Sequence, residues 1–456
     1  MTTNVTEAAV PHPLSNPSFV GYVATQFLGA FNDNLFKQLM LLLAIPTAVA
    51  GGVAAAADGG GSDLQGIATV VFGIPFVIFG GVAGYLADRY SKRRVIVFSK
   101  AAEIVVMVLG LFAFLAAPTI GFSGLWVVMF LMGMQSAFFG PAKYGILPEM
   151  MQSNQLARAN GIVLMTTFIA IIFGTALAGP LKDLAGNGEA NQLAAAPRLW
   201  FASVVCILIA IIGTAVSFLI RPVAAAAPGL SFSREYLVVP KPMRGLLRQD
   251  TQLVLALGAS CVFWMIAGLT VQSVNSLCIS QLKLTNTATS LMVALISIGI
   301  AVGGVTAGWL SRSGNGDSGP RILRYGMWGV VVSCAIMSIT LPGGQLLVGR
   351  WGLPLLLIAL GGAAAFFSIP IQVFLQARPP VELKGRMIAV MNQANFFAIV
   401  MSGVLYMALD QFVIAMDWPR STLFAAMALL FLPVAIFYKL EPSGQQTVGD
   451  NATLDR

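Results

Sequence analysis

The side chains best suited to chemistry in this sequence lie close together near its amino terminus, within a long apolar segment. There an acid, Asp33, and a base, Lys37, are four residues apart. A helix would place both on one face together with Gln26, and Asp33 and Lys37 could form an ion pair. A charge at the centre of a bilayer costs roughly 2.5 to 3.5 kcal/mol, so such groups should face a protein interior or a watery cavity. Two interpretations are open: these groups line a substrate path, or they form a structural pair that fixes helix packing. The polar residues of this segment are Gln26, Asn32, Asp33, Asn34, Lys37 and Gln38.

Further polar side chains interrupt other apolar segments. An amide between membrane helices contributes about 0.6 kcal/mol, so each alone is better explained as a bond between helices than as a ligand contact. Inward-facing candidates are Glu103, Gln135, Lys143, Gln272, Gln372, Gln376, Asn392, Gln393 and Asn395. The predicted substrate-binding set is Gln26, Asn32, Asp33, Asn34, Lys37, Gln135, Lys143, Gln272, Gln372 and Asn392.

The sequence lacks the patterns of most enzymes and metal sites. His12 is its single histidine, which excludes histidine-based acid–base catalysis and most metal centres. The four cysteines, Cys206, Cys261, Cys278 and Cys334, form no CxxC pair and are interpreted as packing residues. No GxxxxGK phosphate loop is present, so ATP hydrolysis is not expected. We therefore expect a protein that is not an enzyme and that needs no metal or cofactor.

The composition requires that the elements positioning these residues lie in lipid. Of 456 residues, 57% are hydrophobic and 10% charged, and the mean hydropathy is +0.84. A span needs about 20 apolar residues, and about twelve such stretches fit, which predicts an all-α polytopic membrane protein with no room for a soluble enzyme domain. The predicted spans are Ser18 to Ala48, Leu64 to Ala87, Val95 to Leu115, Leu125 to Tyr144, Asn160 to Leu181, Leu199 to Ile220, Leu253 to Leu277, Ser290 to Leu310, Leu323 to Leu341, Leu355 to Leu375, Met387 to Leu409 and Ser421 to Tyr438.

The distribution of lysine and arginine predicts the orientation. Cations are concentrated on the side that also carries both termini, which the positive-inside rule assigns to the cytoplasm. The net charge of +8 therefore reflects topology, and no nucleic-acid partner is expected. We predict a multi-pass protein of the cell inner (cytoplasmic) membrane. The inside cations are Arg89, Lys92, Arg93, Arg94, Arg158, Arg221, Arg234, Lys241, Arg244, Arg248, Arg312, Arg321, Arg324, Arg378, Lys384, Arg386 and Lys439, against Lys182, Arg198, Lys283, Arg350 and Arg420 outside.

An internal repeat divides the chain into two halves of six spans. GGVAGYLADR (Gly80 to Arg89) recurs as GGVTAGWLSR (Gly303 to Arg312), and AFFGP (Ala137 to Pro141) recurs as AFFSIP (Ala365 to Pro370), in the same order. The basic, Pro/Ala-rich stretch between the halves is predicted to be a linker, either a solvated tether or partly a membrane-surface segment. The predicted divisions are an N-terminal tail 1–17, six-helix bundles 18–221 and 251–440, a cytoplasmic loop 222–250 and a C-terminal tail 441–456.

The loop after the second span carries a recognisable motif. GYLADRYSKRR (Gly84 to Arg94) resembles the G-x-x-x-D-R-x-G-x-R-R pattern of the major facilitator superfamily, with Ser91 in place of the usual glycine. The resemblance implies that Asp88 meets a helix amino terminus and an arginine of the other half, Arg386 by the repeat, and holds the cytoplasmic side closed. Lys92 is interpreted as a membrane anchor. The predicted gating residues are Gly84, Asp88, Arg89, Arg93, Arg94, Arg158 and Arg386.

Longer strings resemble one branch of that superfamily. QFLGAFNDNLFK (Gln26 to Lys37), AFFGPAKYGILPE (Ala137 to Glu149), ANG (Ala159 to Gly161) and LQARPPVELKGRMIAVMN (Leu375 to Asn392) are similar to the bacterial lysophospholipid transporter family. They are also similar to the transporter half of fusions with acyltransferase and acyl-acyl carrier protein synthetase domains. The resemblance implies ATP-independent flipping of a lysophosphatidylethanolamine-like lipid from the outer to the inner leaflet. It also implies a cytosolic acyltransferase or acyl-acyl carrier protein synthetase as partner.

The same resemblance implies roles for particular residues. Asp33 matches the family's transport carboxylate and would meet the ammonium group, while Lys37 or Lys143 would meet the phosphate. The single acyl tail would stay in lipid through a lateral opening. The chain departs from the standalone members at Val271 and Gln272, where an arginine is usual, and at Ala377, where an acid is usual.

Two other functions are compatible with the sequence. One is a proton-coupled exporter of drugs or small metabolites, with Asp33 or Glu103 as the titrating acid. The other is a non-transporting membrane partner that recruits a cytosolic acyltransferase through the central loop.

Overall fold

A computed structural model describes most of the chain. The described residues are 16–46, 63–186, 192–232, 241–313, 318–342, 345–380 and 383–439. The predicted N-terminal tail, apart from Asn16 and Pro17, and the whole of the predicted C-terminal tail lie outside these ranges, and so do residues 233–240 of the predicted central loop.

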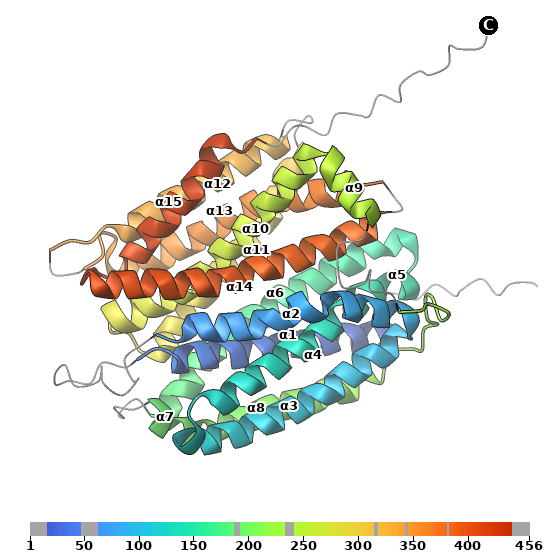
Figure 1. Ribbon diagram of the computed structural model, residues 1–456, viewed down its shortest axis with the longest axis horizontal. Helices are drawn as coiled ribbons and strands as arrows, with labels where there is room; N and C mark the ends of the chain where they lie inside the picture. Colours follow the sequence, from blue (N-terminus) through green and yellow to red (C-terminus); the bar gives the residue numbers. More distant parts are fainter. Residues whose placement is uncertain are drawn as a thin grey trace, which may run out of the picture.

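Twelve long helices of the described chain form the body of the molecule (Figure 1). Nine helical segments among the described residues are long and apolar enough to cross a membrane. The other three are α1, which carries the polar cluster, α12, which begins near Arg321 and Arg324, and the shorter α15. The all-α, twelve-helix prediction is thus confirmed. The helices are α1 (Pro17–Leu43), α2 (Gln65–Arg89), α3 (Lys92–Ile120), α4 (Ser123–Gly145), α6 (Ser153–Leu184), α8 (Trp200–Ser217), α10 (Thr251–Ser276), α11 (Asn286–Ser313), α12 (Ser318–Ser338), α13 (Gly349–Ala377), α14 (Lys384–Ala415) and α15 (Thr422–Phe437).

Short helices complete the connections. Alpha-helical turns α5 (Leu147–Met150) and α7 (Gln192–Ala195) and the 3-10 turn Ala196–Leu199 lie in the first half. A π-helical turn, Leu277–Gln281, extends α10. In the central loop, α9 (Lys241–Gln249) has Met243 buried in the second-half core, and its Leu246 and Leu247 side chains pack against that core. Part of the loop is therefore an amphipathic helix held by the protein.

Each half has its own hydrophobic core. Buried side chains such as Leu35, Phe36 and Phe114 cluster among the first six long helices, while Phe367, Phe424 and others cluster among the last six. In Figure 1 the second half lies above the first. The predicted pair of six-helix bundles is confirmed, because apolar residues are buried within each half.

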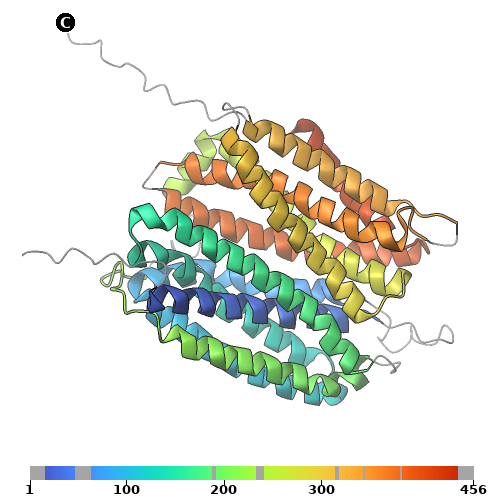
Figure 2. The same ribbon diagram turned by 180° about the vertical axis from the view of Figure 1, so that it is seen from behind.

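The two halves meet along two pairs of helices, α2 with α14 and α6 with α11 (Figures 1 and 2). We define the terminal face as the end of the bundle where α1 begins and α15 ends, and the opposite face as the end where α1 finishes and α2 begins. Near the opposite face a Cβ placed on Gly66 would lie 2.5 Å from the Gly403 carbonyl oxygen, and one on Gly179 would lie 2.2 Å from the Asn286 carbonyl oxygen. Glycine is therefore required for the backbones to approach this closely.

Toward the terminal face the halves separate. Contacts between α2 and α14 include the stacked rings of Phe76 and Phe396, with centroids 3.8 Å apart, and the bond from Gln393 Nε2 to the Val77 carbonyl, 3.0 Å. Beyond them, a Cβ placed on Gly80 or Gly84 would meet nothing within 4 Å. The molecule is thus closed at the opposite face and open at the terminal face.

Some predicted boundaries were wrong. The first helix ends at Leu43 and not at Ala48, because Ala44 caps it and the chain turns. Several helices begin before the predicted apolar stretches at the terminal face. Thus α3 begins at Lys92 and α14 at Lys384.

At the terminal face Asp250 caps α10 by accepting a bond from the Leu253 amide. The hydrogen bond from Arg378 holds the pKa of Asp250 below its ordinary value.

Candidate functional site

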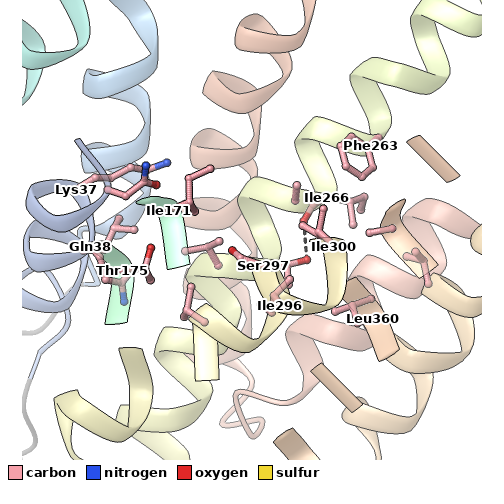
Figure 3. Close-up of a pocket in the computed structure, with 18 of the residues that line it drawn as sticks. Lys37, Gln38, Ile171, Thr175, Phe263, Ile266, Ile296, Ser297, Ile300 and Leu360 are labelled. Carbon is pink, nitrogen blue, oxygen red and sulfur yellow. Dashed lines mark hydrogen bonds between the residues drawn. The ribbon is translucent and has the colours of Figure 1, made fainter. Parts of the chain in front are cut away.

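A cavity lies at mid-depth between the two halves (Figure 3). Its empty volume is about 870 Å³, a figure that includes space open to solvent. The helices α1 and α6 contribute one wall, and α10, α11, α12, α13 and α15 contribute the rest.

The two ends of this cavity differ in chemistry. At the first-half end, Asn34, Lys37, Gln38 and Thr175 supply the polar groups. The second-half end is lined mainly by aliphatic and aromatic side chains, and Figure 3 places Phe263, Ile266, Ile300 and Leu360 on the side away from Lys37. An amphiphile with a compact polar group and one apolar chain matches this division.

Lys37 is the charged residue among the described residues that line the cavity. Its ammonium lies 5.2 Å from the centre of the Phe72 ring, a cation–π distance. In the described structure it forms no ion pair with Asp33, although the helical spacing permits one. The ammonium therefore remains available to an anionic ligand.

Asp33 points to a neighbouring helix. Its carboxylate accepts hydrogen bonds from Ser136 Oγ at 2.7 Å and from Gln135 Nε2 at 3.3 Å, both on α4. The side chain is half-buried, and it is not among the residues lining the cavity. One helix thus presents its acid and its base to different neighbours.

Two other polar residues of α1 bond within the first half. Gln26 donates to Thr166 Oγ1 and accepts from Thr167 Oγ1, which ties α1 to α6. Asn32 Nδ2 donates to Glu103 Oε1 at 2.7 Å, and Glu103 is paired with Lys100 in the bundle interior. In this conformation both residues bond one helix of the first half to another.

The remaining substrate-binding candidates are scattered. Lys143 is buried on α4, with its ammonium 5.2 Å from the centre of the Tyr144 ring, and Gln272 is buried on α10, donating to the Gly268 carbonyl. Gln372 is half-buried on α13, and Asn392 is exposed on α14. Of the predicted set, the described cavity wall includes Asn34 and Lys37.

A polar network joins the halves near the opposite face. Gln38 Nε2 donates to Asn275 Oδ1, and Asn275 Nδ2 donates to Gln65 Oε1. Gln65 Nε2 and the Tyr406 hydroxyl both donate to Asp63 Oδ2, at 3.0 and 2.7 Å. Burial raises the pKa of Asp63, while the bonds from Gln65 and Tyr406 lower it. Asp63 carries no signal in the sequence, because it lies just before the α2 span, where an acid is unremarkable.

Asp183 forms a second connection at the opposite face. Its carboxylate, near the end of α6, accepts bonds from the backbone amides of Asn286 and Thr287, at 3.2 and 2.8 Å. It also accepts from Asn286 Nδ2 and Thr287 Oγ1, at 2.8 and 2.6 Å. Asp183 thus caps α11 across the interface, where the helix dipole favours a negative charge.

At the terminal face the predicted gating residues are not engaged across the halves. Asp88, Arg94, Arg158 and Arg386 are exposed, and within the described ranges Asp88 and Arg386 form no ion pair with each other. A Cβ placed on Gly84 would meet nothing within 4 Å, and the expected contact of Asp88 with the second half stays a prediction.

The motif's other cations secure the chain that follows the first half. Arg89 donates to the Leu230 carbonyl and the Tyr85 hydroxyl, both at 2.6 Å, and Arg93 donates to the Phe218 carbonyl at 3.2 Å. Lys92 is buried and paired with Glu149, so its interpretation as a simple anchor is corrected.

Comparisons with known proteins agree with this architecture. The family model described as Major Facilitator Superfamily matches residues 23–403. The curated "Lysophospholipid transporter LplT" of Yersinia pestis (strain Pestoides F) is 30% identical over 415 residues, covering 86% of this chain and 87% of its own length. The protein of that name from Yersinia pseudotuberculosis serotype I (strain IP32953) matches equally. The resemblance predicted from the motifs is confirmed.

Solved structures show the same fold at low sequence identity. A point mutant of the nucleoside transporter NupG is 14% identical, with a TM-score of 0.65 over 91% of this chain and 97% of its own. A D-xylose–proton symporter is 15% identical, with a TM-score of 0.65 over 94% of this chain and 98% of its own. These likenesses concern the arrangement of helices.

Proposed function

Because this chain belongs to the Major Facilitator Superfamily, we propose that it moves a lysophospholipid between the leaflets of the cytoplasmic membrane by alternating access. The observation that carries the proposal is the two-ended cavity, with Lys37 at one end and an apolar wall at the other. A lysophospholipid has one phosphate-bearing headgroup and one acyl chain, which matches this division. The curated relatives named as lysophospholipid transporters support the same substrate class.

The proposed direction is from the outer to the inner leaflet. By the positive-inside rule the terminal face is cytoplasmic, so the described conformation would be open to the cytoplasm and ready to release its cargo. The bundles 18–221 and 251–440 would move as the two bodies of the cycle. To open outward, the molecule would break the Asp183 and Asp63 connections and bring Asp88 to the amino terminus of α14.

Transport by the purified protein tests this function. Reconstituted in liposomes, it should move fluorescent lysophosphatidylethanolamine between leaflets, leave diacyl phosphatidylethanolamine in place and need no ATP. Loss of lysolipid transport on removing a proton gradient would establish proton coupling. Gradient-driven movement of a drug-like cation without lysolipid movement would instead favour the exporter. A protein that moves neither would contradict transport and favour the recruiting role.

Asp33 offers a prediction within this function. Replacing Asp33 by asparagine should lower lysophosphatidylethanolamine uptake at least tenfold. The variant would lose the charge-assisted hydrogen bond proposed between the Asp33 carboxylate and the substrate ammonium, and such a bond contributes about 1.5 to 3 kcal/mol. Asparagine can still accept from Ser136, so helix packing should persist. Uptake in spheroplasts measures the effect, with membrane insertion checked by immunoblot. Wild-type uptake by this variant would remove Asp33 from the mechanism.

A further inference from the structure

We infer that the apolar end of the cavity holds the acyl chain of the substrate and that a cluster of three phenylalanines limits the length of chain it accepts. The cluster consists of Phe263, Phe367 and Phe431, from α10, α13 and α15. This inference rests on the proposed function. It places the tail inside the second half, whereas the sequence resemblance suggested a tail left in lipid.

The cluster forms a fixed wall. The rings of Phe367 and Phe431 meet edge to face, with centroids 5.0 Å apart, and Phe263 lies 6.0 Å from Phe367. Phe367 and Phe431 are both almost fully buried in the second-half core. Side chains packed in this way cannot move aside without disturbing the bundle, so they end the space open to a chain.

The walls leading to the cluster are mainly apolar, with Ser297 contributing a hydroxyl among the aliphatic side chains. Leu360, Ala364, Ile296 and Ile300 line the space. Thr270 also lines it, but its hydroxyl donates to the Ile266 carbonyl of its own helix at 2.7 Å. A polar headgroup would find no charged partner among the described residues of this end, whereas methylene groups would be shielded from water.

The width of the space depends on small residues. A Cβ on Gly361 would lie 2.1 Å from the Ile296 carbonyl oxygen, so α13 and α11 are in backbone contact beside the cavity. Ala364, almost one turn further along α13, leaves room where a larger side chain would project. Ala364 and Phe431 are therefore the positions at which chain length can be tested from opposite directions.

The experiment measures transport of lysophosphatidylethanolamines with acyl chains of increasing length by the full-length protein in liposomes. Ala364→Phe should lower transport of the longest chains most, by about fourfold for each methylene that loses its place. Phe431→Ala should shift the preferred length upward. Matched controls are Ala359→Phe and Phe437→Ala, on the exposed sides of the same helices, which should keep the wild-type profile.

The outcomes separate this inference from the function it rests on. If the wild-type protein moves no lysolipid, the proposed function fails. If it does, and both cavity variants keep the wild-type chain-length profile or lose all lengths equally, the tail does not occupy this end. Size-exclusion profiles exclude misfolding, and Phe431→Leu, a smaller change, should give the same upward shift to a lesser degree.

Discussion

Replacing Lys37 by methionine is expected to reduce lysophospholipid transport about a hundredfold. The ammonium of Lys37 provides the positive charge of the described cavity wall, and a charge-assisted hydrogen bond to a phosphate there contributes about 1.5 to 3 kcal/mol, or roughly ten- to 150-fold. Lys37 is the one charged side chain among the described residues of the cavity wall, which favours the upper part of that range. Methionine is similar in length and packs well on an aromatic ring, so the contact with Phe72 should survive.

Two controls distinguish loss of charge from loss of structure. Lys37→Arg keeps the cation and should retain a measurable part of transport. Lys283→Met removes a cation beyond the end of α10, outside the cavity wall, and should leave transport unchanged. Rates are measured in liposomes at equal protein content, with thermal stability followed by intrinsic fluorescence. Lys37→Met transport within twofold of wild type would show that the phosphate binds elsewhere.

Replacing Asp183 by alanine should shift the balance between the two open states about a hundredfold toward the state open at the opposite face. The carboxylate accepts four bonds from the start of α11, and the two from backbone amides alone contribute about 3 kcal/mol. Every 1.4 kcal/mol is tenfold in the ratio of states. Because these bonds cross the interface, the loss falls on the described conformation and not on either half alone.

Accessibility of the cavity reports this shift. A cysteine at Thr175, which lines the cavity, should react with a membrane-impermeant maleimide from the terminal face in the parent protein and from the opposite face in the Asp183→Ala variant. The native Cys261 is replaced first, because it is partly accessible. Asp417→Asn, at an exposed acid near the opposite face, is the matched control and should behave as the parent. An unchanged labelling pattern in Asp183→Ala would contradict the role of this cap.

The sequence was sufficient for the fold because lipid imposes it. Long apolar segments must be helices in a bilayer, and the recurrence of GGVAGYLADR as GGVTAGWLSR indicates the duplication. The site was predicted less well. Lys37 and Asn34, which line the cavity, were singled out because polar residues are rare in such helices, but helical spacing could not show that Asp33 bonds Ser136 and not Lys37.

The apolar part of the site had no signal in the sequence. Phe263, Phe367 and Phe431 look like ordinary membrane residues, and their meeting depends on how three distant helices pack. Asp183 was missed for a related reason, since its partners are backbone amides that carry no residue identity. Contacts that depend on tertiary packing or on main-chain atoms leave no pattern of residue types in the sequence, so they cannot be predicted from it.

The separate cores of the two halves bear on the activation barrier of the cycle. When the two halves separate near the opposite face, they would expose polar groups that water can solvate. Examples are the backbone at Gly179, the amide of Asn275 and the carboxylate of Asp183. Most of each core lies within its own half, so little of the hydrophobic free energy that keeps each half folded would oppose the motion, apart from contacts such as that of Phe76 with Phe396. Replaceable hydrogen bonds and a few apolar contacts would then set the turnover rate, and the protein could cycle quickly while each half stays rigid.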